Sequence, residues 1–164
     1  MKGGPLRTFG YGQFRIFWMA CFVSQITFSM MLITRGWLVL KLTDSPFLVT
    51  AVTATAMLPQ SLGAPFTGVM ADRFNRRTIL IMGEVTNFVV LLVLSLLVLM
   101  ELVQTWHVFA LSALSGIALA FILPTRPVVV PNLVPSQDLV NGMALYSTLF
   151  SASMFVGPAM AGYI

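Results

Sequence analysis

Among the few charged residues of this chain, two groups predict different chemistry. Only 9% of the 164 residues are charged. Four charged side chains nevertheless lie within six consecutive positions: Asp72, Arg73, Arg76 and Arg77. Arginines of this kind can bridge carboxylates in one conformation and release them in another. The second group consists of single charges within long apolar runs: Arg35, Glu84 and Arg126.

A charge within an apolar run needs a reason, because a charged side chain at the centre of a bilayer costs about 2.5–3.5 kcal/mol. For Arg35 two interpretations remain open, snorkelling to the outer interface or lining a substrate path. Glu84 and Arg126 reach similar depths from the inner side, so we expect them to pair or to share a network with the Gly68–Thr78 loop. Glu84 is also the carboxylate best placed to carry a proton through a membrane span.

The composition predicts a membrane protein. The chain is 58% hydrophobic, whereas soluble domains are about half apolar and about a quarter charged. The net charge of +4 comes from basic residues that are scattered or lie at helix ends, so we expect lipid as a partner and no nucleic acid. The lone Cys21 and the lone His107 give no ligand cluster, so no metal and no cofactor are expected.

Five apolar runs are long enough to cross a bilayer, which takes about 20 helical residues. Residues 1–15 form a cytoplasmic N-terminal segment, and residues 16–164 form a transmembrane region that we expect to be truncated before a sixth helix. The expected spans cover residues of about 16–42, 46–71, 78–100, 107–131 and 139–164.

The basic residues predict the orientation of these spans. Lys and Arg gather in the segment before the first span and in the loop after the second, whereas only Lys41 counts on the other side. By the positive-inside rule we therefore expect the N-terminus to lie in the cytoplasm. The expected location of the protein is the cell (inner) membrane. Tyr11 and Trp18 fit an inner aromatic belt, and Trp37 and Trp106 fit an outer one.

An internal echo relates the first and fourth spans. Arg35 lies 19 residues after Ile16, and Arg126 lies 19 residues after His107. The offset of about 91 residues also aligns the turns that follow the two spans. Such an echo is what an inverted three-helix repeat would leave, an architecture used by many secondary transporters.

The charged loop carries a family resemblance. The segment from Gly68 to Arg77, GVMADRFNRR, resembles the signature loop of the major facilitator superfamily, Gly-x-x-x-Asp-Arg-x-Gly-Arg-Arg/Lys. Asn75 stands where that family usually has glycine, and asparagine visits the left-handed backbone region more readily than most residues. The resemblance implies that this loop is a latch between the two halves of a transporter.

The fifth span carries a second resemblance, to the small-residue motif of the antiporter branch that ends Gly-Pro-x-x-Gly-Gly. Its residues here are Ser153, Gly157, Pro158, Ala161 and Gly162. Ser153 and Ala161 stand where glycine is usual. LKLTDSP and LPTRPVVVPNLVP are similar to the drug and siderophore exporter-like subgroup, the transmembrane secretion effectors.

Together these resemblances imply an all-α polytopic membrane protein with the major facilitator fold, represented by the first five of a presumed twelve helices with inverted three-helix repeats. They imply a secondary active transporter that exports small amphiphilic, drug-like or siderophore-like molecules by alternating access. Protons are the expected coupling ion, and the C-terminal half of the same protein is the expected partner of the latch.

Two other classes remain as alternatives. A non-transporting membrane scaffold or partner subunit would have the same spans without a substrate path. A membrane-embedded enzyme is disfavoured because the sequence has no His-Glu-x-x-His motif and no pair of intramembrane aspartates.

Overall fold

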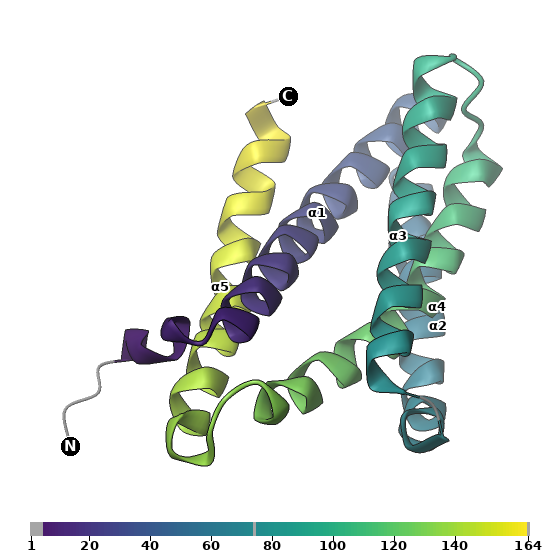
Figure 1. Ribbon diagram of the computed structural model, residues 1–164. Helices are drawn as coiled ribbons and strands as arrows, with labels where there is room; N and C mark the ends of the chain where they lie inside the picture. The colour runs from purple at the N-terminus through teal and green to yellow at the C-terminus, as the bar shows by residue number, and fades with distance from the viewer. Residues whose placement is uncertain (1–4, 74, 164) are drawn as a thin grey trace. The chain divides into compact units, whose positions relative to one another are not determined.

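The computed structural model describes residues 5–73 and 75–163, with side chains from 8–63 and 75–162. The described residues form five α-helices and three short 3₁₀ segments, and no strand occurs among them (Figure 1). The elements are η1 (Pro5–Gly10), α1 (Gly12–Thr43), α2 (Pro46–Arg73), α3 (Arg76–Leu99), α4 (Thr105–Val129), η2 (Val130–Asn132), η3 (Ser136–Asp138) and α5 (Leu139–Tyr163). The prediction of an all-α protein is confirmed.

The helices have the length and composition that a bilayer requires. Four segments within the described residues are long and apolar enough to cross one: Gly12–Thr43, Arg76–Leu99, Thr105–Asn132 and Ser136–Gly162. α2 is also 28 residues long, but its threonines, Pro59 and Gln60 make it less apolar. Large apolar side chains point outward, and Phe47 and Phe155 are 77% and 80% exposed. These outer faces suit contact with lipid chains rather than water.

The chain divides into two compact units. The terminal unit contains Met1–Ile33 and Arg126–Ile164, and the central unit contains Thr34–Thr125. α1 and α4 each run from one unit into the other, so each of these helices contributes a different stretch to each unit.

The terminal unit is held together at the start of α1. Phe14, Val130 and Val134 form its buried cluster, which joins α1 to the segment between α4 and α5. The Tyr11 hydroxyl donates to Asp138 Oδ2 at 2.9 Å, and the Trp18 indole Nε1 donates to the Leu145 carbonyl oxygen at 2.9 Å. The start of α1 and the residue before it are therefore fastened to η3 and to the beginning of α5.

Further along, α1 and α5 approach each other through a glycine. A Cβ placed on Gly157 would meet the Ser29 Cβ, and it would lie 3.1 Å from the Ile26 carbonyl oxygen and 3.3 Å from the Met30 nitrogen. Only a residue without a side chain permits this backbone approach, as small residues do between membrane helices.

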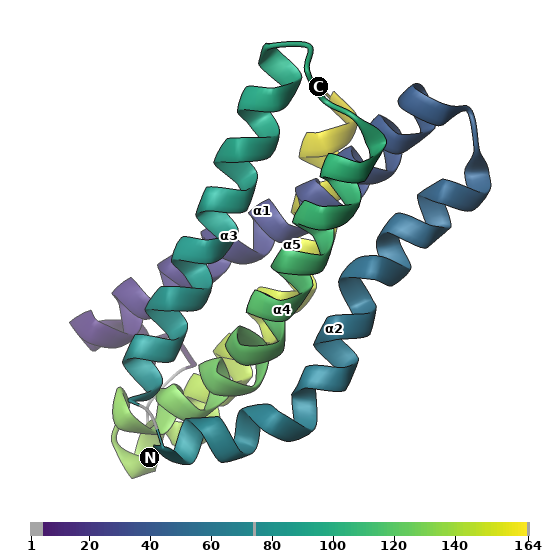
Figure 2. The same cartoon turned by 90° about the vertical axis from the view of Figure 1, so that its right-hand side faces the viewer.

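In the central unit α4 lies between α2 and α3, as Figure 2 shows. A Cβ on Gly116 would meet the Ala56 carbonyl oxygen of α2, and one on Gly83 of α3 would lie 2.5 Å from Ile122 Cγ1 of α4. The Ser115 hydroxyl donates to Asn87 Oδ1 at 2.7 Å, which adds a polar contact between α4 and α3.

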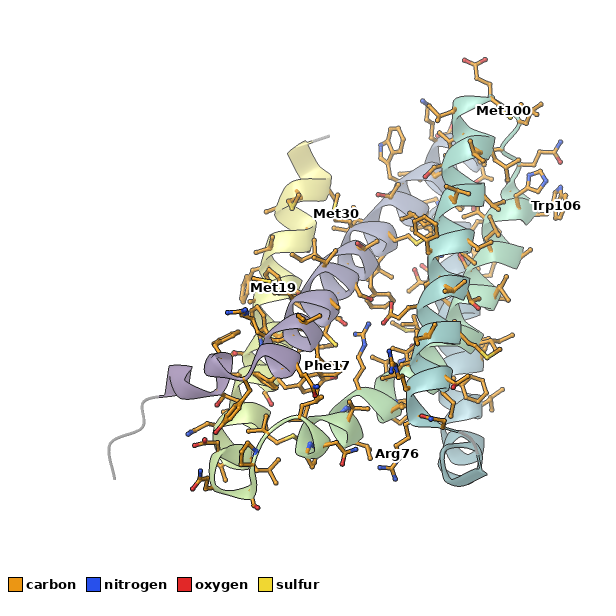
Figure 3. The ribbon with its side chains drawn as sticks, viewed as in Figure 1. Phe17, Met19, Met30, Arg76, Met100 and Trp106 are labelled. Atoms are coloured by element: carbon orange, nitrogen blue, oxygen red, sulfur yellow. The ribbon has the colours of Figure 1, made fainter. Side chains whose placement is uncertain are left out.

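The two ends of the central unit carry different residues. Figure 3 shows Met100 and Trp106 at one end and Arg76 at the other. After α3 the chain turns at Glu101, whose φ of 57° lies in the left-handed region. The Glu101 and Leu102 amides donate to the Val98 and Leu97 carbonyls at 3.1 and 3.0 Å, a Schellman pair that ends the helix without the usual glycine.

The close approach at Gly157 yields a stability prediction. Gly157→Ala should lower the free energy of unfolding of the full-length protein by about 1–3 kcal/mol, because the added methyl group meets backbone atoms of α1 that cannot rotate away. Thermal unfolding in detergent measures this change.

Gly162→Ala in the same helix is the matched control, since a Cβ there has nothing within 4 Å. Equal unfolding temperatures for the two variants would contradict the packing seen between α1 and α5.

Candidate functional site

A buried cation on α4 is the centre of the polar cluster in the terminal unit. Arg126 is only 3% exposed. Its Nη1 donates to Gln25 Oε1 at 3.2 Å, and its Nη2 donates to Ser24 Oγ at 2.6 Å. Both acceptors lie on α1, so the guanidinium of one helix is held by two adjacent side chains of another.

The chemistry of the three side chains fixes how they face one another. A guanidinium has only donors, so the Gln25 amide must turn its oxygen toward Arg126. Its nitrogen Nε2 then faces away from the guanidinium. Gln25 is 3% exposed, and Nε2 is buried with no hydrogen-bond partner among the described residues. The cluster therefore places the guanidinium of Arg126 beside an amide N–H donor that has no acceptor among the described residues.

Arg35 occupies a different environment, in the central unit. It is 6% exposed, and its Nε and Nη2 atoms are buried without a hydrogen-bond partner in the described part of the chain. A snorkelling side chain would carry its guanidinium to water. The burial of these two nitrogens argues against snorkelling. That Arg35 lines a substrate path stays a prediction.

Glu84 lies in α3 and is half-buried. It belongs to the central unit, whereas Arg126 belongs to the terminal unit. The expected pairing of Glu84 with Arg126 stays a prediction.

The charged loop is an interruption of only a few residues between two helices. Gly68, Asp72 and Arg73 belong to the last turns of α2, and their side chains lie outside the described residues. Arg76 and Arg77 begin α3 and are exposed. Their charges are therefore available to segments beyond this helix pair.

Asn75 has a different role from the one that its family position suggested. Its φ of −62° and ψ of 119° are extended, not left-handed, and its side chain accepts a hydrogen bond from the Arg77 amide at 3.0 Å. Asn75 is the N-cap of α3. Asparagine is favoured there because its side-chain oxygen satisfies an amide that has no partner within the helix.

The small-residue motif of α5 is only partly packed. Ser153 is fully buried and its hydroxyl donates to the Leu149 carbonyl at 2.8 Å. Gly157 contacts α1, and Pro158 follows inside the helix. Ala161 is half-buried and Gly162 is exposed, so the contact with α1 is made at the first part of the motif.

Sequence reasoning missed the acceptors around Arg126 and the fastening at Tyr11 and Trp18. Gln25 was recognisable as a polar residue within a span, but no local signal linked it to Arg126, which lies 101 residues away. No group of three or more potential metal ligands occurs among the described residues.

The contrast between the two buried arginines can be measured. Arg35→Met should raise the free energy of unfolding of the full-length protein by about 1 kcal/mol or more, because an apolar chain of similar length replaces a buried guanidinium with two unbonded nitrogens. Arg126→Met should lower it by about 1–3 kcal/mol, because Ser24 and Gln25 lose their bonded partner.

Thermal unfolding of both variants in detergent tests this prediction. If Arg35→Met were as destabilising as Arg126→Met, a partner outside the described residues would hold Arg35, and the predicted contrast would be wrong.

The chain resembles bacterial efflux proteins along most of its length. It is 26% identical over 152 residues to a macrolide efflux protein A of Streptococcus pyogenes, covering 93% of this chain and 38% of that protein. It is 27% identical over 117 residues to a macrolide efflux protein A of Enterococcus faecalis, covering 71% of this chain and 36% of that protein. It is also 26% identical over 122 residues to the uncharacterized MFS-type transporter YfiS of Bacillus subtilis strain 168, covering 74% of this chain and 28% of that protein.

The chain thus spans well under half the length of these curated relatives. No solved structure matches it significantly. Residues 3–164 match the family described as transmembrane secretion effector. Together with its apolar helices, this match shows that the chain is a multi-pass membrane protein of the transmembrane secretion effector family, within the major facilitator superfamily of transporters.

Proposed function

We propose that the whole protein is a secondary active exporter of small amphiphilic molecules that works by alternating access. The observation that carries this proposal is the buried cation at Arg126, bonded by Ser24 and Gln25 of another helix. Ionisable groups inside membrane spans are rare and mark solute or proton pathways. The relatives named for macrolide efflux support export as the direction and macrolides as a first compound to test.

Proton coupling is the finer part of the proposal, and Glu84 is the residue that we assign to it. It is the one carboxylate well inside an apolar span of the sequence, and it is half-buried in α3. Carboxylates inside membrane spans serve as proton relays in pumps and transporters.

The charged loop supplies the conformational latch in this proposal. Arg76 and Arg77 are exposed at the start of α3, and Asp72 is placed one helix turn before them in sequence. In one state the arginines bridge carboxylates of the C-terminal half, and in the other they release them. In this proposal the protein lies in the inner membrane. Its N-terminus and the charged loop face the cytoplasm, because the positive-inside rule places segments rich in Lys and Arg there.

Transport in vesicles tests the exporter proposal. The full-length protein in inside-out membrane vesicles should accumulate the macrolide erythromycin when the vesicle interior is acidic, and a protonophore should abolish the accumulation. Vesicles without the protein are the control. If none of a panel of amphiphilic compounds moves faster than in control vesicles, the chain is not part of an exporter.

The coupling residue is tested in the same vesicles. Glu84→Gln should abolish accumulation driven by the gradient while downhill movement of erythromycin continues, because the amide cannot exchange a proton. Glu101→Gln removes an exposed carboxylate from the turn after α3 and should leave accumulation unchanged. Gradient-driven accumulation by Glu84→Gln at the wild-type rate would assign coupling to another group.

A further inference from the structure

The side-chain amide of Gln25 has a buried hydrogen-bond donor without an acceptor among the described residues. Its oxygen is used by Arg126 Nη1 at 3.2 Å, and its Nε2 has no hydrogen-bond partner among the described residues although Gln25 is 3% exposed. A buried donor without a partner is unfavourable, so the amide gains from any acceptor that reaches it. The orientation cannot reverse to relieve this, because the reversed amide would point donors at the guanidinium.

The neighbouring groups restrict which partner suits this position. Arg126 is positively charged and also donates its Nη2 to Ser24. A cationic group of the ligand placed at Nε2 would be repelled by Arg126, and a group with only donors could not bond to Nε2. An oxygen that accepts hydrogen bonds fits both the amide and the adjacent positive charge.

We propose that the Gln25 side-chain amide recognises the transported compound by donating to one of its acceptor oxygens, a carbonyl, lactone or carboxylate oxygen. This inference rests on the proposed export function and adds the chemical class of substrate. Because Gln25 is nearly closed off here, the oxygen reaches it in another conformation of the transport cycle, which alternating access supplies. Arg126 acts as the positioning residue that keeps the amide nitrogen turned away from the guanidinium.

A substitution that is nearly isosteric separates the donor from the rest of the cluster. Gln25→Glu keeps an oxygen for Arg126 and replaces the Nε2 donor by a second acceptor. The contact to Arg126 becomes an ion pair in which both donor and acceptor are charged, so the unfolding temperature of the substrate-free protein should not fall. The KM for erythromycin, which carries lactone and ketone oxygens, should rise about tenfold in the vesicle assay.

Gln13→Glu is the matched control, because it makes the same change on α1 at an exposed position, and its KM should equal that of the wild type. Two results for Gln25→Glu would overturn the inference. A wild-type KM would mean that water alone satisfies the amide, and a raised KM with a lowered unfolding temperature would mean that Gln25 acts only on the structure. If the wild-type protein itself moves no compound, the proposed function fails first, and the inference fails with it.

Discussion

The cost of a positive charge away from water governs how this chain is arranged. Arg126 is 3% exposed within a protein whose outer faces suit lipid, so its guanidinium needs acceptors from its own surroundings. Ser24 and Gln25 provide them from α1. These bonds hold the last turn of α4 against the first part of α1 within the terminal unit. The cluster of Phe14, Val130 and Val134 adds apolar contacts to the same unit.

Small residues set the remaining helix contacts, since lipid chains offer no hydrophobic advantage to one helix pairing over another. Gly116 lies against the backbone of α2, Gly83 against Ile122, and Gly157 against the backbone of α1. Each contact is specific because a methyl group would obstruct it. Such glycine contacts occur in both units. The packing of the helices within each unit therefore depends on the fit of their surfaces as well as on polar contacts.

The length of the apolar runs and the cost of isolated charges were enough to predict an all-α membrane protein and to single out Arg126. The partners of Arg126 could not be predicted, because they lie 101 and 102 residues away and have no local signature. Asn75 was misjudged because the family pattern suggested a turn, whereas the start of α3 needed an N-cap. Tyr11 and Trp18 fitted an interfacial belt by type, but their polar atoms bond to Asp138 and to the Leu145 carbonyl.

The fastening of Tyr11 and Trp18 has a consequence for biosynthesis. Each of the two hydrogen bonds joins residues 127 positions apart, so the segment that leaves the ribosome first acquires its partners only after the fifth helix has been made. Until then the Tyr11 hydroxyl and the Trp18 indole nitrogen do not have these two acceptors. The earliest part of the chain is thus among the last to reach its final form, and a nascent chain stopped before Leu145 would leave Trp18 accessible to solvent or to the insertion machinery.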